Sequence, residues 1–194
     1  VVDGNFLPDM PNKMLSSGDF KQDANLLIGT AADEGSGFLN FVDPAINEKK
    51  FTYEQARATL TAFAQTFTKK YSVNGEDIAR IYFNGLSQHT DPNSLKRTIG
   101  IPLGDFVLAC PTKLFAKEFF RNSHFKNNVY EYLWNTKLSK SLFPTVQEWW
   151  GPSHGEDAGA AHGLPFLRPD QYNDTDRQIS ELVMKFIIKF VKSG

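Results

Sequence analysis

The sequence predicts an α/β fold with a few parallel strands and several helices. Two short segments, residues 24–35 and 127–135, have the length and composition of strands. Helical patterns fill the interval between them, and this β-α-β order is typical of parallel strands. A late amphipathic segment, residues 173–194, predicts a further helix with one apolar face.

The two predicted strands differ in character. The first segment, "ANLLIGTAADEG", is an apolar run that ends in small residues, a carboxylate and a glycine, as expected at the tip of a buried strand. The second, "NNVYEYLWN", is rich in aromatic residues and alternates in polarity. Two parallel strands alone would leave both sheet edges unpaired, so we expect the chain to be part of a larger unit.

The segment from residue 51 to 71 predicts a helix that begins with a capping box of Thr52 and Gln55. Its apolar residues recur at helical spacing: Ala56, Leu60, Phe63 and Phe67. Helical character continues through residues 75–86 and 93–122, where three glycines and a proline are expected to break it into pieces. These breakers are Gly85, Gly100, Pro102 and Gly104.

The composition is that of one soluble globular unit, with 194 residues, 41% of them hydrophobic and 22% charged. The net charge is -1 and the basic residues are spread thinly, so neither a nucleic-acid-binding face nor a polybasic lipid anchor is predicted. Three lysines interrupt the apolar C-terminal segment, so no membrane span is predicted there.

The stretch "WWGPSHGEDAGAAHG", residues 149–163, contains four side chains that are competent zinc ligands: His154, Glu156, Asp157 and His162. Their spacing matches neither two ligands on one helical turn nor a tight knuckle, so no metal and no cofactor are predicted. Residues of these types also form plain solvated turns, and that alternative stays open on composition alone.

Combining this stretch with the tip of the first strand favours an active site instead. An acid at the C-terminal end of a parallel strand and a histidine on a later loop are what an α/β active site requires. In the α/β-hydrolase fold the chain order is nucleophile, acid, histidine, and Glu34 precedes His154 accordingly.

Several motifs, in order over nearly the whole chain, together resemble the type-B carboxylesterase family, which includes the cholinesterases. "VVDGNF" and "LLIGTAADEGSGFL" are similar to that family's "V-x-DG-x-F … LL-x-G … DEGS-x-F" segment. "GDFVLACP" is similar to its "D-x-x-F/V-x-CP" helix, and "SHGEDAGAAHGLPF" to its "G-x-x-HG-x-E/D … FG-x-PF/L" loop. The resemblance implies that residues 1–194 are the C-terminal part of a single α/β-hydrolase domain, incomplete without the upstream half.

The resemblance also implies roles for the residues of the two loops. Glu34 would be the acid and His154 the general base of a Ser-Glu-His triad. His162 falls on a position that is usually aromatic, which indicates a structural residue. Glu156 and Asp157 would line the gorge or support the histidine.

A substrate pocket is implied beside the acid. Phe38 resembles an acyl-pocket residue, and Trp149 is a further pocket candidate. Gly37 replaces an aromatic residue that in cholinesterases faces the quaternary ammonium, so a general carboxylesterase is favoured over choline specificity. The adjacent Asp33 is interpreted as a solvated or structural charge.

Three further positions match the family. Asp105 would be a structural buried acid, and Cys110 a disulfide cysteine whose cholinesterase partner has no counterpart in these residues. The sequon "NDT" at Asn173, together with the resemblance, implies a secreted glycoprotein.

No G-x-S-x-G elbow and no early glycine-rich oxyanion loop occur in these residues. The serines of "SSG" and "GSG" lack the elbow pattern. We therefore predict that the serine lies in an upstream half, that a small carboxylic ester is the substrate, and that this chain alone is inactive. Two alternatives stay open: a non-catalytic cholinesterase-like adhesion or binding module, and an independent small binding domain.

Overall fold

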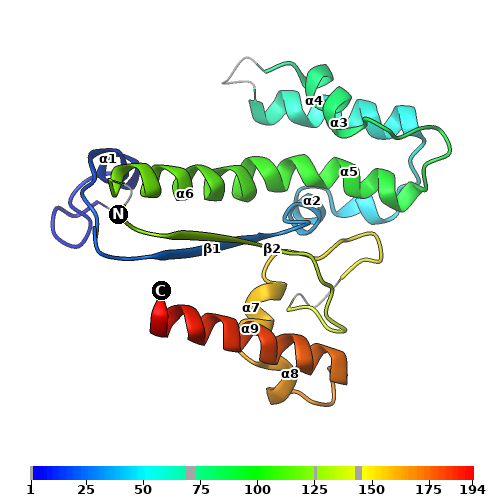
Figure 1. Cartoon of the computed structure of the whole chain (residues 1–194). Helices are drawn as coiled ribbons and strands as arrows, with labels where there is room; N and C mark the ends of the chain where they lie inside the picture. Colours follow the sequence, from blue (N-terminus) through cyan, green and yellow to red (C-terminus); the bar gives the residue numbers. More distant parts are fainter. Residues whose placement is uncertain (1, 69–72, 125, 143–145) are drawn as a thin grey trace.

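The computed structural model describes residues 2–68, 73–124, 126–142 and 146–194, and it places two parallel strands between helical layers (Figure 1). The strands are β1 (Leu26–Ala31) and β2 (Val129–Trp134). They pair in register from Leu26 opposite Val129 to Ala31 opposite Trp134. The predicted α/β class and both predicted strands are therefore confirmed.

Helices make up most of the remaining structure. Before β2 these are α1 (Pro11–Ser17), α2 (Ser36–Val42), the 3-10 helix η1 (Pro44–Asn47), α3 (Tyr53–Thr68), α4 (Gly75–Tyr82), α5 (Pro92–Gly104), the π-helical turn η3 (Asp105–Ala109) and α6 (Cys110–Asn122). After β2 come α7 (Glu156–Ala161), α8 (Leu164–Leu167) and α9 (Asp174–Ser193). In Figure 1, α5 and α6 lie on one side of the sheet and α9 on the other.

The predicted capping box starts α3. The backbone N–H of Gln55 donates to Thr52 Oγ1 at 3.2 Å, and the Thr52 N–H donates to Gln55 Oε1 at 3.0 Å. Ala56 and Leu60 are fully buried, as their spacing predicts. The side chain of Phe67 lies outside the described part of the chain.

The predicted breaks inside residues 93–122 are wrong, because α5, η3 and α6 follow one another without interruption. The glycines serve a close approach of α5 to the turn after β1. A Cβ on Gly104 would lie 2.5 Å from the Gly35 nitrogen, and one on Gly35 would lie 1.9 Å from the Gly100 carbonyl oxygen. Pro102 stands inside α5, whereas Gly85, at φ +82°, does follow the end of α4.

The continuous helix has a property that the residue pattern did not predict. Over its 31 residues, Pro92–Asn122, it is long and apolar enough to cross a membrane, and it is the one such helix in the described residues. Of its most apolar part, 33% is buried inside the structure. Core helices of soluble proteins have the same length and composition, so this finding is weak support for a membrane span.

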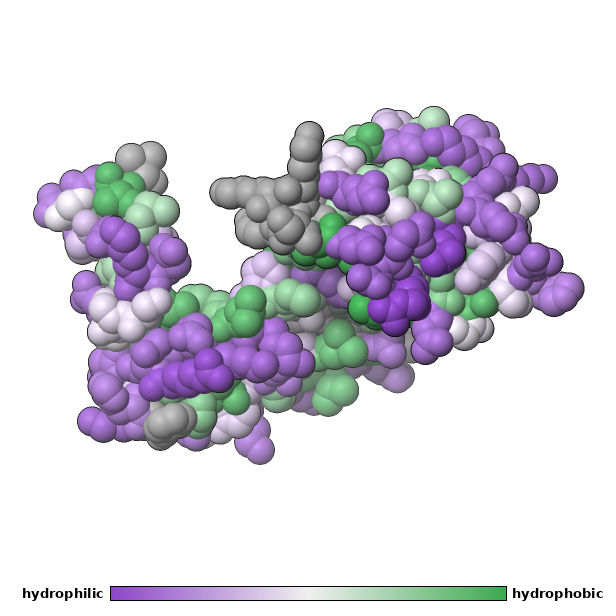
Figure 2. All heavy atoms as spheres, turned by 90° about the horizontal axis from the view of Figure 1, so that it is seen from above, coloured by the Kyte–Doolittle hydropathy of each residue, from purple (hydrophilic) through white to green (hydrophobic). Residues whose placement is uncertain are grey.

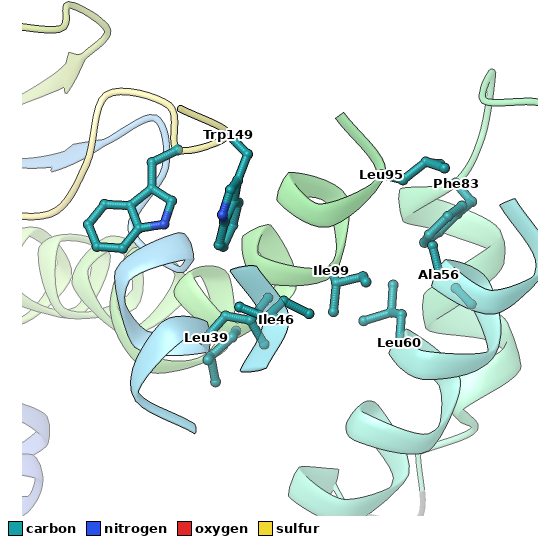
Figure 3. Close-up of a cluster of buried hydrophobic side chains, with 11 residues drawn as sticks. Leu39, Ile46, Ala56, Leu60, Phe83, Leu95, Ile99 and Trp149 are labelled. Atoms are coloured by element: carbon teal, nitrogen blue, oxygen red, sulfur yellow. The ribbon is translucent and has the colours of Figure 1, made fainter. Parts of the chain in front are cut away.

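The larger core cluster joins α2, η1 and the three helices α3, α4 and α5 (Figure 3). Its buried members are Leu39, Ile46, Ala56, Leu60, Ala79, Phe83, Leu95, Ile99, Leu103, Trp149 and Trp150. The two tryptophans belong to the loop that precedes α7, so this core anchors that loop against α2 and α5.

The second cluster lies where β1 and β2 end, against α7 and α9. Its buried members are Ala31, Trp134, Leu138, Ala160 and Tyr172, and Ile179 and Val183 of α9 pack against it. The predicted apolar stripe of α9 is only partly covered, because Leu182, Phe186 and Val191 are exposed. On the face seen from above, hydrophobic patches also lie among hydrophilic side chains (Figure 2).

Candidate active site

Two loops meet beyond the carboxyl ends of the strands, where ligands bind in parallel sheets. The first follows β1, and the second precedes α7. Asp33 and Ser153 form an isolated parallel bridge, and the Asp33 N–H donates to the Pro152 carbonyl at 3.0 Å. Because the bridge places these residues opposite each other, the next residue of each loop, Glu34 and His154, become neighbours.

A short hydrogen bond joins the predicted acid and base. His154 Nδ1 lies 2.7 Å from Glu34 Oε2. The other carboxylate oxygen, Oε1, accepts a hydrogen bond from the Ala31 N–H at 2.7 Å, so the acid is held at both oxygens. Glu34 is 8% exposed and the His154 side chain 43% exposed. Binding through Nδ1 leaves the Nε2 atom of His154 for proton transfer.

The carboxylate changes the acid–base behaviour of the histidine. The hydrogen bond to Glu34 raises the pKa of His154 above its ordinary value of 6.5, against the opposing effect of burial. The negative charges of Glu34 and Asp157 act in the same direction. Asp157 accepts a hydrogen bond from the Tyr132 hydroxyl at 2.7 Å. Burial and this carboxylate raise the pKa of Tyr132, so the phenol remains a donor.

Asp33 is a structural residue, the second of the two interpretations that the sequence allowed. It is 1% exposed. Its Oδ1 accepts from the Ser36 N–H at 3.0 Å, and its Oδ2 accepts from the Ser36 hydroxyl at 2.7 Å and the Gly151 N–H at 2.6 Å. Arg97 Nε forms an ion pair with the same Oδ2 at 3.2 Å. Neither Arg97 nor Gly151 was singled out from the sequence, because no local pattern connects them to Asp33.

Of the predicted pocket residues, Phe38 lies beside the Glu34–His154 pair, whereas Trp149 lies in the hydrophobic core. The half-buried Phe38 ring lies beside His154, with ring centroids 5.4 Å apart. Gly37 is buried and faces Trp150, whose ring would lie 3.7 Å from an added Cβ. Trp149 is 5% exposed and donates its indole N–H to Asn47 Oδ1 at 3.1 Å. Its assignment to the pocket is corrected, because its side chain fills the core (Figure 3).

The other two side chains considered as zinc ligands, Glu156 and His162, contact different residues. Glu156 is buried and accepts from the Ser153 hydroxyl at 3.0 Å, and burial raises its pKa. His162 is exposed, with Nδ1 2.8 Å from the Ala158 carbonyl oxygen. Within the described residues, no group of three or more His, Cys, Asp or Glu side chains could hold a metal ion.

Three other predicted positions lie away from the pair in sequence. Asp105 is half-buried, which corrects its prediction as a buried acid, and it accepts from the Tyr82 hydroxyl at 2.6 Å. Cys110 is an exposed free thiol at the start of α6. Asn173 is exposed and caps α9, with its Oδ1 accepting from the Asp176 N–H at 2.9 Å.

Known proteins resemble this chain along its whole length. Residues 1–194, the whole chain, match the family described as the carboxylesterase family. The chain is 28% identical over 197 residues to a cholinesterase of Mus musculus, and 27% identical over 194 residues to an acetylcholinesterase of Bungarus fasciatus. Both alignments include 100% of this chain but 31% of the relative. The chain thus spans about a third of the length of these curated relatives.

Proposed function

The chain belongs to the carboxylesterase family, and on that premise we propose that it supplies the acid and the general base of a serine carboxylic ester hydrolase. The hydrogen bond of 2.7 Å between Glu34 and His154 carries the proposal. Glu34 holds the His154 ring in the tautomer that is protonated on Nδ1, and it stabilises the imidazolium that forms during the reaction. His154 takes the proton from a serine hydroxyl as that oxygen attacks the ester carbonyl, and then returns it to the leaving alcohol.

The serine and the oxyanion hole belong, in this proposal, to an upstream half of the same domain. Exposed apolar side chains support such a neighbour, since large apolar patches mark surfaces that another element covers. Leu133 on β2, together with Leu182 and Val191 on α9, is exposed in this chain. The small two-stranded parallel sheet supports it as well, because parallel sheets are normally extended by further strands.

The proposed substrate is a small carboxylic ester. Phe38, next to His154, offers an apolar wall for the acyl group. Gly37 offers no aromatic face for a quaternary ammonium group, so a general ester is favoured over a choline ester. The alternative, a non-catalytic adhesion or binding module, is disfavoured because the acid–base pair is intact.

Two proteins of different length test the proposal. The longer protein, with its upstream half, is expected to hydrolyse a chromogenic ester such as p-nitrophenyl acetate and to react covalently with a fluorophosphonate serine probe. Residues 1–194 alone are expected to do neither, because the nucleophile and the oxyanion hole are missing. A longer protein that folds but neither hydrolyses esters nor binds the probe would overturn the proposed function.

The raised pKa of His154 predicts a pH dependence. Only the neutral imidazole can act as base, so kcat/KM of the longer protein should rise with pH through an inflection above 6.5. Removing the carboxylate by Glu34→Gln should move the inflection of the residual activity to lower pH, because the hydrogen bond that favours the charged ring is weakened. An inflection that stays in place would contradict this origin of the shift.

We also infer a secreted glycoprotein, with Asn173 as the acceptor. The exposure of Asn173 supports this, and its Oδ1 would continue to cap α9 after glycosylation. Its Nδ2 donates to Ser139 Oγ at 2.5 Å, and a glycosylated Nδ2 keeps one N–H for that contact. The substitution Thr175→Ala removes the sequon and leaves the cap intact. Protein secreted from eukaryotic cells should lose mass on glycosidase treatment, and the T175A variant should not.

A further inference from the structure

We propose that Arg97 of α5 is a positioning residue for the Glu34–His154 pair. We call the loop after β1 the acid loop and the loop before α7 the histidine loop. The guanidinium contacts Asp33 in the acid loop and Gly151 in the histidine loop, and through these contacts it would keep the two loops in register. This inference rests on the proposed function, since it assigns one more residue to the same reaction. Arg97 touches neither member of the pair in any contact described above, so its role is indirect.

Asp33 is the centre of the arrangement. The residue is 1% exposed, and its carboxylate accepts hydrogen bonds from both loops, from Ser36 in one and Gly151 in the other. Glu34 is the next residue along the chain, so the position of the triad acid follows that of Asp33. A buried carboxylate is costly without a cation, and the ion pair with Arg97 supplies one from a third element.

Gly151 makes room for the guanidinium. A Cβ on this residue would lie 2.3 Å from Arg97 Nη2, 2.5 Å from Cζ and 2.7 Å from Nε. The planar group therefore lies directly against the glycine backbone, whose N–H donates to Asp33 at 2.6 Å. His154 follows three residues later in the chain. Arg97 thus forms an ion pair with Asp33 in the acid loop and packs against Gly151 in the histidine loop.

Loss of Arg97 would change the position of His154 relative to Glu34. Proton transfer needs the imidazole within a fraction of an ångström of its working position, and misplacement by about 1 Å can reduce a rate by about 100-fold. Loss of Arg97 would free both loops to shift at the residues adjoining the pair. The reaction would slow while substrate binding, which depends on other surfaces, would change little.

The test uses Arg97→Met in the longer protein, with Arg57→Met as the matched control. Arg57 also pairs with a carboxylate, Glu76 at 2.7 Å, and its side chain is 40% exposed against 37% for Arg97. We expect R97M to lower kcat by about 10- to 100-fold with KM within about threefold, by analogy with other supporting residues. R57M should leave both constants unchanged. Gly151→Ala, which crowds the guanidinium, should resemble R97M.

A second readout separates positioning from folding and from the proposed function. The proton between His154 Nδ1 and Glu34 is observed by NMR in the longer protein, together with the thermal midpoint. R97M should weaken or broaden this signal at temperatures where it is fully folded, although its thermal midpoint should fall below that of R57M because Asp33 loses its cation. Arg97→Lys should restore part of the signal. An unchanged signal and unchanged kcat in R97M would overturn the inference, as would a signal that survives while kcat falls. If the wild-type protein hydrolyses no ester, the proposed function fails, and the NMR signal alone decides on Arg97.

Discussion

Replacing His154 by alanine in the longer protein is expected to lower kcat for ester hydrolysis by about 10⁴- to 10⁶-fold, with KM little changed. In the proposed mechanism the imidazole makes both proton transfers of the reaction, and among the described residues His154 is the histidine hydrogen-bonded to Glu34. His154 is held by Glu34 at 2.7 Å, whereas His162 is exposed and lies beside the Ala158 carbonyl. Steady-state kinetics with a chromogenic ester measure the effect.

The two histidines of the same stretch provide the control for this prediction. His162→Ala should retain activity within about twofold, because its ring is exposed and its described contact is a local one, to the Ala158 carbonyl at 2.8 Å. His154 is 43% exposed, so its removal should also leave the thermal midpoint within a few degrees. Equal losses in both variants, or full activity in H154A, would contradict the assignment of His154 as the base.

The elements that could be predicted from sequence are those whose determinants are local. The capping box of Thr52 and Gln55, the apolar spacing of α3 and the composition of β1 each lie within one short segment. The continuity of α5 and α6 could not be predicted, because Gly100 and Gly104 are helix breakers by propensity alone. Glycine is required at these positions because the helix packs closely against Gly35, a residue far away in the chain.

The site follows the same division. Glu34 and His154 could be identified because each lies in a motif with its own local pattern, and the parallel bridge at Asp33 and Ser153 explains why they meet. The surroundings of Asp33, the neighbour of Glu34, could not be predicted. Whether Asp33 is solvated or buried depends on where α5 places Arg97, and that is a property of the assembled fold.

The same close packing predicts the largest effect on stability in this chain. Gly104→Ala in the longer protein should lower the free energy of unfolding by roughly 3 kcal/mol, at the upper end of the range for overpacked cores. The new Cβ would lie 2.5 Å from the Gly35 nitrogen and 2.8 Å from Glu34 Cβ. Both obstacles are close to the backbone, so neither can rotate away. Because Glu34 would be displaced, ester hydrolysis should fall together with the urea midpoint.

Gly37→Ala is the matched control, since it adds the same methyl group inside another helix. There the Cβ would lie 3.7 Å from the Trp150 ring, an ordinary van der Waals contact. Alanine is favoured over glycine by up to about 1 kcal/mol within a helix, so G37A should be neutral or more stable. If G104A unfolds at the same urea concentration as G37A, then α5 does not approach the acid loop this closely. In that case the glycines of α5 would need a different explanation. The proposed role of Arg97 would also lose support, because it requires α5 to pack closely on the loop after β1.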